Sequence, residues 1–185
     1  MRNVFACLPI ILCLAGPALA AEEPARGERL DTLFSELKRT ANAAAARRVA
    51  GRISAIFTES GSATVDLLMQ RAKTAMDGKD HGLALDLLDQ VIMLEPDYAE
   101  GWNRRATVHF MMKNHAKAMS DIERVLELEP RHFGALTGMA AILRAEDRDE
   151  SALRVYEKAL DLYPMMREAQ EAVGRIADQL AGEPI

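Results

Sequence analysis

The sequence predicts an all-α fold, a solenoid of stacked antiparallel helix pairs with an N-terminal helical pair and a C-terminal capping helix. Two observations support this prediction. Pro96, Pro130 and Pro164 are spaced 34 residues apart, and each ends a similar short segment of apolar and acidic residues. The apolar residues follow the same spacing. A fixed period of this length is typical of chains that stack one supersecondary unit many times.

A shift of 34 residues also aligns small and bulky side chains in columns. The columns hold Leu68, Trp102 and Leu136; Ala72, Ala106 and Ala140; and Ala84, Ala118 and Ala152. Within each period the apolar residues recur at helical spacing, which predicts two helices per unit. Alanine suits the places where two helices approach most closely, because a larger side chain there would cost about 1–3 kcal/mol through overpacking.

These columns divide the central chain into three units, residues 65–98, 99–132 and 133–166. Each closing proline is predicted to end the second helix of its unit, because the residue before a proline is pushed out of the helical region. The same proline is predicted to begin the next helix, where its missing N–H costs nothing.

The bulky residue, the small residue four positions later, the second alanine and the closing proline resemble the tetratricopeptide repeat family. The resemblance implies a right-handed α-solenoid, and it covers about 100 of the 185 residues. Two columns depart from the family pattern. Arg71, Arg105 and Met139 stand where leucine is usual, and Lys79, Lys113 and Asp147 stand where a turn glycine is common. The resemblance concerns an architecture, which does not fix a function.

Residues 1–20 have the pattern of an export signal, with Arg2, an apolar run and small residues before Ala21. The alternative is an uncleaved membrane anchor, but the apolar run of about 12 residues is shorter than the roughly 20 that span a bilayer. Cys7 and Cys13 both lie in this segment. The predicted location is outside the cytoplasm, in a bacterial periplasm, with no integral membrane segment after cleavage.

The ends of the array have their own predicted elements. Residues 21–27 are predicted to be a disordered leader, and residues 28–63 a pair of amphipathic helices. This pair can be interpreted as a degenerate repeat, since Ala50 falls in the alanine column, although Ser62 replaces the proline. Residues 167–185 are predicted to form a capping helix and tail, because an array needs a polar outer face at its end.

Composition and motifs exclude several classes of function. The chain has 23 basic and 28 acidic residues, a net charge of −5, and no basic stripe, which argues against nucleic-acid binding. It has no phosphate-binding glycine loop, no zinc-protease motif and no nucleophile elbow. His81 and His115 lie one period apart, too far to share one metal ion. The sequence therefore predicts a protein that is not an enzyme and that has no cofactor or metal.

The family resemblance implies that the first helix of each unit lines a concave groove that binds peptides. The residues in these columns are Asp66, Met69, Lys73, Asn103, Arg104, Thr107, Met111, Gly134, Thr137, Gly138, Ala141 and Arg144. Asn103 and Arg104 can hydrogen-bond a peptide backbone or a carboxylate. Gly134, Gly138 and Ala141 form a bare strip, which suits either a docked partner or close packing inside the domain. Some relatives hold a terminal carboxylate with a lysine and asparagine clamp, and this sequence does not reproduce that clamp.

The sequence thus predicts a non-enzymatic scaffold of the cell envelope that binds a peptide or helix of a partner protein in the groove. Two alternatives remain open, a chaperone-like assembly or maturation factor and a non-catalytic subunit of an envelope enzyme complex. A further alternative is that the N-terminal pair occupies the groove itself.

Overall fold

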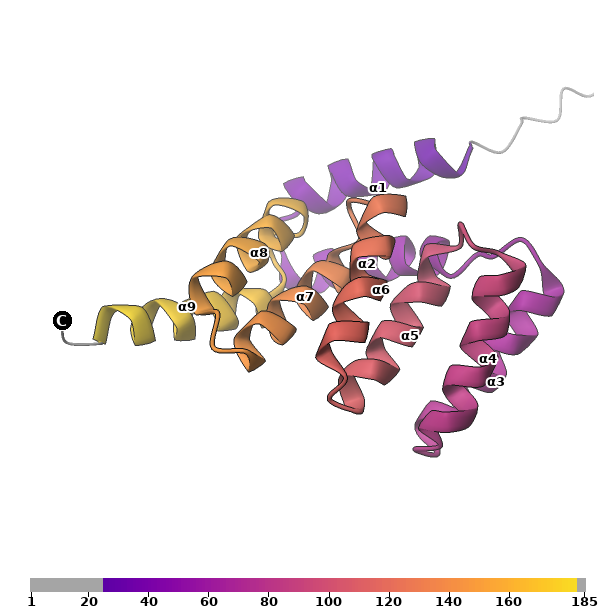
Figure 1. Ribbon diagram of the computed structural model, residues 1–185. Coiled ribbons are helices and arrows are strands. Elements are labelled where there is room, and N and C mark those ends of the chain that lie inside the picture. The colour runs from indigo at the N-terminus through magenta and orange to yellow at the C-terminus, as the bar shows by residue number, and fades with distance from the viewer. Residues whose placement is uncertain (1–24, 183–185) are drawn as a thin grey trace, which may run out of the picture.

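The computed structural model describes residues 25–182, which form α-helices and no strands (Figure 1). The all-α fold predicted from the sequence is confirmed. The predicted signal at residues 1–20, residues 21–24 of the predicted leader and the tail from residue 183 lie outside the described residues. Within residues 25–182, no helix has the combination of length and apolar character that crossing a membrane requires.

The helices follow one another with short connections. Their bounds are α1 Arg26–Arg39, α2 Ala43–Phe57, α3 Ala63–Asp77, α4 His81–Leu94, α5 Ala99–Met111, α6 His115–Leu128, α7 Phe133–Ala145, α8 Asp149–Leu162 and α9 Arg167–Gly182. The predicted leader at residues 21–27 is wrong at its end, because α1 already begins at Arg26. Its first turn carries Glu28, a residue type that the positive end of a helix dipole favours.

The pairs α3–α4, α5–α6 and α7–α8 are three antiparallel hairpins that stack in sequence order (Figure 1). The alanine columns lie at the hairpin contacts. Their exposed fractions are 3% or less at Ala72, Ala84, Ala106, Ala118, Ala140 and Ala152. The helix α9 stands where the first helix of a fourth unit would stand. The side chain of Gln170 donates to the carbonyl of Pro164 at 2.8 Å, as Trp102 does to Pro96 at 2.9 Å.

The closing prolines end helices but do not begin them. The helix α4 ends at Leu94, Pro96 lies in the following turn, and α5 begins only at Ala99. The backbone N–H of Tyr98 donates to the carbonyl of Glu95 at 3.1 Å, so a separate turn stands between the two helices. The prediction that proline occupies the first helical position is therefore wrong.

The turns inside the three units all contain a residue in the left-handed conformation. The φ angles are 61° at Lys79, 60° at Lys113 and 56° at Asp147, in the column where a glycine would be unstrained. For residues with a side chain this conformation costs about 1–2 kcal/mol. The turn is held because the next N–H bonds back to the first helix, as Asn114 N does to His109 O at 2.8 Å.

Replacing Lys113 with glycine is expected to raise the free energy of unfolding by about 1 kcal/mol, because glycine adopts this φ without steric cost. For a domain of this size the melting temperature should rise by about 2–4 °C. The matched control is Gly61→Ala, since Gly61 has a φ of 76° and an added Cβ there would meet no atom within 4 Å. That substitution should lower the melting temperature, and an unchanged or lower value for Lys113→Gly would contradict the assignment of strain.

The N-terminal hairpin α1–α2 lies across the turns that connect successive units. Tyr98, in the first connecting turn, donates its hydroxyl to the carbonyl of Thr58 at 2.9 Å. In the second turn, the ring of His132 stacks on Phe57 with centroids 4.6 Å apart, and Arg131 pairs with Asp31 at 2.5 Å.

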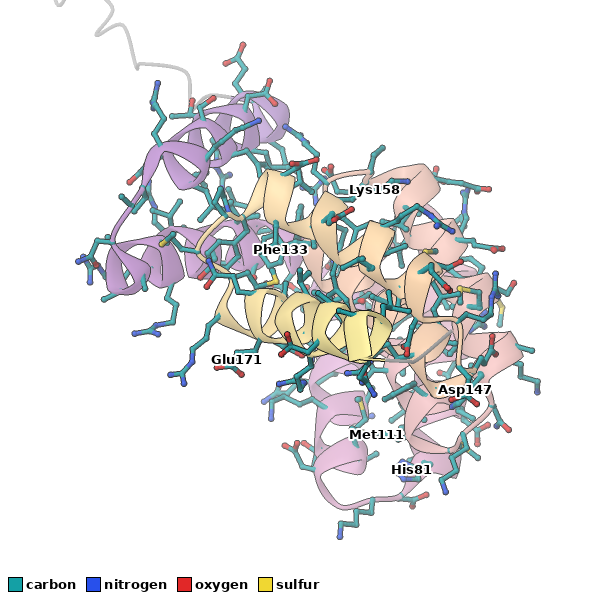
Figure 2. All side chains as sticks on the ribbon, turned by 90° about the vertical axis from the view of Figure 1, so that its left-hand side faces the viewer. His81, Met111, Phe133, Asp147, Lys158 and Glu171 are labelled. Carbon is teal, nitrogen blue, oxygen red and sulfur yellow. The ribbon has the colours of Figure 1, made fainter. Side chains whose placement is uncertain are left out.

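The same hairpin reaches the third connecting turn, where Tyr163 and Met166 are buried in one cluster with residues of α1 and α2. Phe133, which is partly buried, packs against this cluster, with its ring centroid 6.4 Å from that of Phe34 and 5.8 Å from that of Tyr163 (Figure 2). The apolar face of residues 28–63 packs against this cluster, and the hairpin does not stack along α3 as the repeat units stack on one another. The interpretation of this pair as a degenerate repeat stays a prediction.

Candidate functional site

A concave groove runs between α5 and α7. It has a volume of about 230 Å³, and Glu168 of α9 borders it. Small side chains form much of its lining, among them Ala106, Gly138 and Ala141. The hydroxyls of Thr107 and Thr137 donate to carbonyls of their own helices, at 2.9 Å in both cases. Their oxygens can therefore accept hydrogen bonds from a bound segment.

A second hollow of about 240 Å³ adjoins the groove and shares Asn103, Thr107 and Gly134 with it. Its far wall comes from the end of α2, through Ser54, Phe57 and Thr58. The N-terminal hairpin therefore borders one end of the concave surface and leaves the strip along Gly138 open.

Glu100 lies at the base of the second hollow and is a buried charged residue, with 4% of its surface exposed. Its carboxylate accepts from Arg104 Nε at 2.5 Å and from Asn103 Nδ2 at 2.9 Å, and it lies 3.3 Å from His132 Nε2. Burial alone would raise the pKa of Glu100, but the hydrogen bond from His132, the charge of Arg104 and the Asn103 amide together hold this pKa below its ordinary value. The carboxylate is therefore ionised at neutral pH.

His132 links this carboxylate to the start of α7. Its Nδ1 accepts from the backbone N–H of Ala135 at 3.0 Å, which caps the helix. An Nδ1 that accepts carries no proton, so the ring proton sits on Nε2 and points to Glu100. The same ring stacks on Phe57. One side chain thus caps a helix, supports the groove carboxylate and anchors the N-terminal hairpin.

Of the two glycines in the groove, Gly138 is not required by packing. A methyl group at Gly138 would meet only Ile122 Cδ1, at 3.4 Å, an ordinary van der Waals separation. At Gly134 it would meet the ring of His132 at 3.3 Å. Each glycine inside a helix costs about 1 kcal/mol relative to alanine. The packing around Gly138 therefore does not support the interpretation that the bare strip serves close packing inside the domain. Because Gly138 lines the groove, a second chain can approach the strip there.

The predicted groove residues separate into two groups. Seven of them line the two hollows: Asn103, Arg104, Thr107, Gly134, Thr137, Gly138 and Ala141. The other five, Asp66, Met69, Lys73, Met111 and Arg144, line neither hollow. In this second group, Asp66 accepts from Ser60 at 2.5 Å, Lys73 pairs with Asp77 at 2.6 Å, and Met69 packs against the core of the first unit. Met111 is exposed, with 53% of its surface open to solvent.

Sequence reasoning missed several lining residues. Glu168 could have been found, because it stands two periods after Glu100 on α9. Phe110 could have been suspected as well, since it is an aromatic residue one helical turn from Thr107, and 39% of its surface is exposed. Phe57 and Thr58 could not have been found, because the hairpin reaches the groove through contacts between distant segments.

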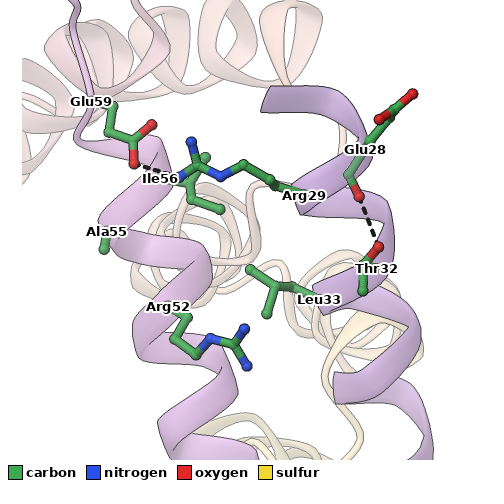
Figure 3. A pocket seen from close by; sticks show the side chains of 8 residues that line it. All are labelled: Glu28, Arg29, Thr32, Leu33, Arg52, Ala55, Ile56 and Glu59. Atoms are coloured by element: carbon green, nitrogen blue, oxygen red, sulfur yellow. Dashed lines mark hydrogen bonds and ion pairs between the residues drawn. The ribbon is translucent and has the colours of Figure 1, made fainter. Parts of the chain in front are cut away.

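A larger hollow of about 490 Å³ lies on the outer side of the N-terminal hairpin, between α1 and α2 (Figure 3). Leu33 and Ile56 contribute apolar surface. The arginines beside them are paired, Arg29 with Glu59 at 2.6 Å and Arg52 with Glu36 at 3.2 Å. This hollow therefore offers no unpaired arginine to a ligand. Among residues 25–182 no group of side chains is arranged to hold a metal ion.

The tetratricopeptide repeat model matches residues 99–132, the unit formed by α5 and α6. A TPR repeat-containing protein of Rhizobium etli is 54% identical over 155 residues, which cover 84% of this chain and 76% of that protein. The chain belongs to the tetratricopeptide repeat (TPR) family. Among more distant TPR relatives, the small glutamine-rich tetratricopeptide repeat-containing protein 2 of Saccharomyces cerevisiae is 32% identical over 97 residues, 52% of this chain and 28% of that protein.

Solved structures show the same TPR fold. The first TPR domain of Spaghetti, solved with an HSP90 peptide, has a TM-score of 0.61 and 24% identity over 64% of this chain and 94% of that domain. A MamA structure has a TM-score of 0.58 and 18% identity over 84% of both chains. At these identities the likeness concerns the fold alone. It places the TPR units of this chain among right-handed helical arrays.

Proposed function

We propose that this TPR protein is a non-enzymatic scaffold of the cell envelope that binds an extended or helical segment of a partner protein in the groove between α5 and α7. The supporting observation is the open strip along Gly138. Gly138 is kept in the interior of α7 at a cost to helix stability, yet nothing in the packing around it requires the absence of a side chain. A close approach by another backbone is the physical use of such a strip.

The polar groups at the end of the groove suit a peptide backbone. The Nε of Arg104 is used by Glu100, and within residues 25–182 its terminal nitrogens have no other partner. The side-chain oxygen of Asn103, Oδ1, can accept a hydrogen bond from a bound segment, because the side-chain nitrogen Nδ2 already donates to Glu100. The charge of Arg104 is balanced by Glu100, and Glu168 adds a negative charge at the other end. These groups favour amide and carbonyl partners over a free carboxylate.

The HSP90 peptide in the Spaghetti complex ends in an acidic residue. Here the columns of the lysine and asparagine clamp hold Met69, Lys73, Arg104, Gly134 and Gly138. We therefore infer that this chain selects an internal segment of its partner. Stable binding of one envelope partner is favoured over chaperone-like binding of many, because a groove bordered by a docked hairpin accepts fewer orientations of a bound segment than an open groove does.

Gly138→Gln is expected to reduce recovery of the native partner by more than tenfold, because the new side chain fills the groove floor. The melting temperature should stay the same or rise, since glutamine is a better helix former than glycine. Affinity purification from the native cell, followed by quantitative mass spectrometry, measures the first quantity. Thermal unfolding measures the second.

The matched control is Gly174→Gln, at an exposed glycine of α9 with no atom near the added side chain. It should raise helix stability and leave partner recovery unchanged. If both variants retain the same partners as the unmodified chain, the groove is not the binding site.

The envelope location rests on residues 1–20 alone. Cell fractionation with N-terminal sequencing should find a periplasmic chain that begins at Ala21, and a cytoplasmic chain that retains Met1 would refute it.

A further inference from the structure

The first TPR unit has an end face that no other element covers. In one column of the array, Val108, Ile142 and Ile176 are each 0% exposed because the preceding unit covers them. Thr74 occupies the same column in α3, and it is exposed. In a second column Gly101 and Ala135 are buried, whereas 48% of Leu67 is exposed. The hairpin α1–α2 lies across the connecting turns and leaves this face free (Figure 1).

We call this surface the N-terminal end face and define it by Leu67, Arg71 and Thr74 of α3 and Leu83 of α4. Leu67 and Leu83 are exposed by 48% and 49%. Both are large aliphatic side chains on adjacent helices of one hairpin. Water therefore contacts an apolar surface at the place where a stacked array continues with another helix.

The second unit shows what covers an equivalent face. There α4 packs against α5, and Leu85 and Asp89 of α4 line a cleft whose other wall includes Lys117 of α6. Arg105 of α5 donates to Asp89 at 2.7 Å and to both oxygens of Asp121 at 2.9 and 2.7 Å. Leu83 stands in the column of Lys117, one period earlier. The covering helix in this case is amphipathic and places a carboxylate beside its leucines.

The charges of the end face match such a helix. Arg71 stands in the column of Arg105, but it is exposed and has no ion-pair or hydrogen-bond partner among residues 25–182. Leu87 takes the column of Asp121, so the unit itself supplies no carboxylate to Arg71 there. Arg105 also pairs with Asp89 of α4, the helix that covers its unit, and Arg71 has no equivalent of this second carboxylate. An incoming helix has to bring it.

We propose that the N-terminal end face docks an amphipathic helix of a partner protein, with a leucine-rich stripe on Leu67 and Leu83 and a carboxylate on Arg71. The incoming helix stands on the first unit as α4 stands on the second. This surface is separate from the groove between α5 and α7. The protein thus has two binding surfaces, one on its concave side and one at the end of the array.

The probe for this site is a hydrocarbon-stapled, fluorescent peptide with the sequence of α4, residues 81–94 (HGLALDLLDQVIML). Fluorescence anisotropy with the full chain is expected to show saturable binding. Arg71→Glu should weaken binding about tenfold, because the probe carboxylate at the place of Asp89 then meets a like charge. A probe with lysine at that place should reverse the preference and bind the Arg71→Glu chain more tightly than the unmodified chain.

The matched control is Lys73→Glu, on the same helix but outside the end face, where Lys73 pairs with Asp77. It should leave the affinity of the probe unchanged. Equal affinity of the unmodified and Arg71→Glu chains would refute the proposal. It would also be refuted by a dimer in sedimentation velocity that Leu83→Glu dissociates, since a second copy would then cover the face. Tighter probe binding by a chain that lacks residues 1–24 would refute it as well, because the occupant would be that segment.

Discussion

Replacing Glu100 with alanine is expected to lower the free energy of unfolding by about 2–4 kcal/mol. The substitution removes a buried carboxylate that accepts from Asn103 and Arg104 and lies beside His132, and it leaves the Nε2–H of His132 buried without a partner. His132 also caps α7 and stacks on Phe57, so its displacement loosens the N-terminal hairpin. Chemical denaturation at pH 7 measures this loss of stability.

The ionisation of the Glu100 carboxylate also makes the free energy of unfolding depend on pH. Because the pKa of Glu100 in the folded chain lies below its ordinary value of 4.5, the ionised form stabilises the fold. This stabilisation is complete above the pKa of the unfolded chain, and it is lost as the pH falls through the lower pKa of the folded chain. As the pH falls below about 4.5, the unmodified chain should therefore lose more stability than Glu100→Gln does.

The control for both experiments is Glu36→Gln, which removes one partner of the exposed Arg52 pair at 3.2 Å. Exposed ion pairs contribute about 0–1 kcal/mol, so this variant should unfold much like the unmodified chain. If Glu100→Ala and Glu36→Gln proved equally stable, the Glu100 cluster would have no structural role. If Glu100→Gln retained the acid sensitivity of the unmodified chain, that sensitivity would come from other groups.

Replacing Gly101 with alanine is expected to lower the free energy of unfolding by about 1–3 kcal/mol. A Cβ atom at this position would lie 2.8 Å from Val91 Cγ1 and 3.4 Å from the ring of Tyr98. Val91 is fully buried and β-branched, so it cannot turn away without entering other atoms. The gain in helix propensity, about 1 kcal/mol, opposes this cost and does not cancel it.

A double-mutant cycle with Val91→Ala tests the cause. Val91→Ala alone should destabilise the chain through the lost methyl groups. Combined with Gly101→Ala, it should cost less than the two single changes added together, because the smaller side chain makes room for the new methyl. Additive effects of the two substitutions would show that the contact with Val91 is not what limits residue 101. Denaturant titrations of all four chains provide the measurement.

Features that recur with the period of 34 residues could be predicted from sequence. The buried alanines, the hairpins and the cap α9 follow from local spacing, and seven of the predicted groove residues line the two hollows. The periodic pattern assigns each residue to a helix face, and the face decides whether a residue of α5 or α7 meets the groove. The position of Glu168 follows from the same rule, carried one unit further.

The N-terminal hairpin could not be placed from sequence. Its helices were visible as amphipathic segments, but amphipathic spacing shows only that one face is buried, not what covers it. The covering surface includes Phe133 at the start of α7 and Tyr163 and Met166 in the third connecting turn, all of which lie far away in the chain. The polar cluster at Glu100 was hidden for the same reason, since His132 joins it from the opposite end of the same unit, 32 residues along the chain.

The hairpin α1–α2 changes how this protein is expected to unfold. In an open solenoid each unit contacts only its neighbours, so the terminal units can melt before the central ones. Here Tyr98, His132 and Tyr163 belong to three successive turns, and all three contact or share a buried cluster with the same hairpin. Unfolding of the last unit would remove the contacts of the hairpin with Tyr163, and it would thereby weaken the contact of the hairpin with Tyr98 in the first turn. Heat and denaturant should therefore disrupt the domain in one cooperative transition, without a partly melted array.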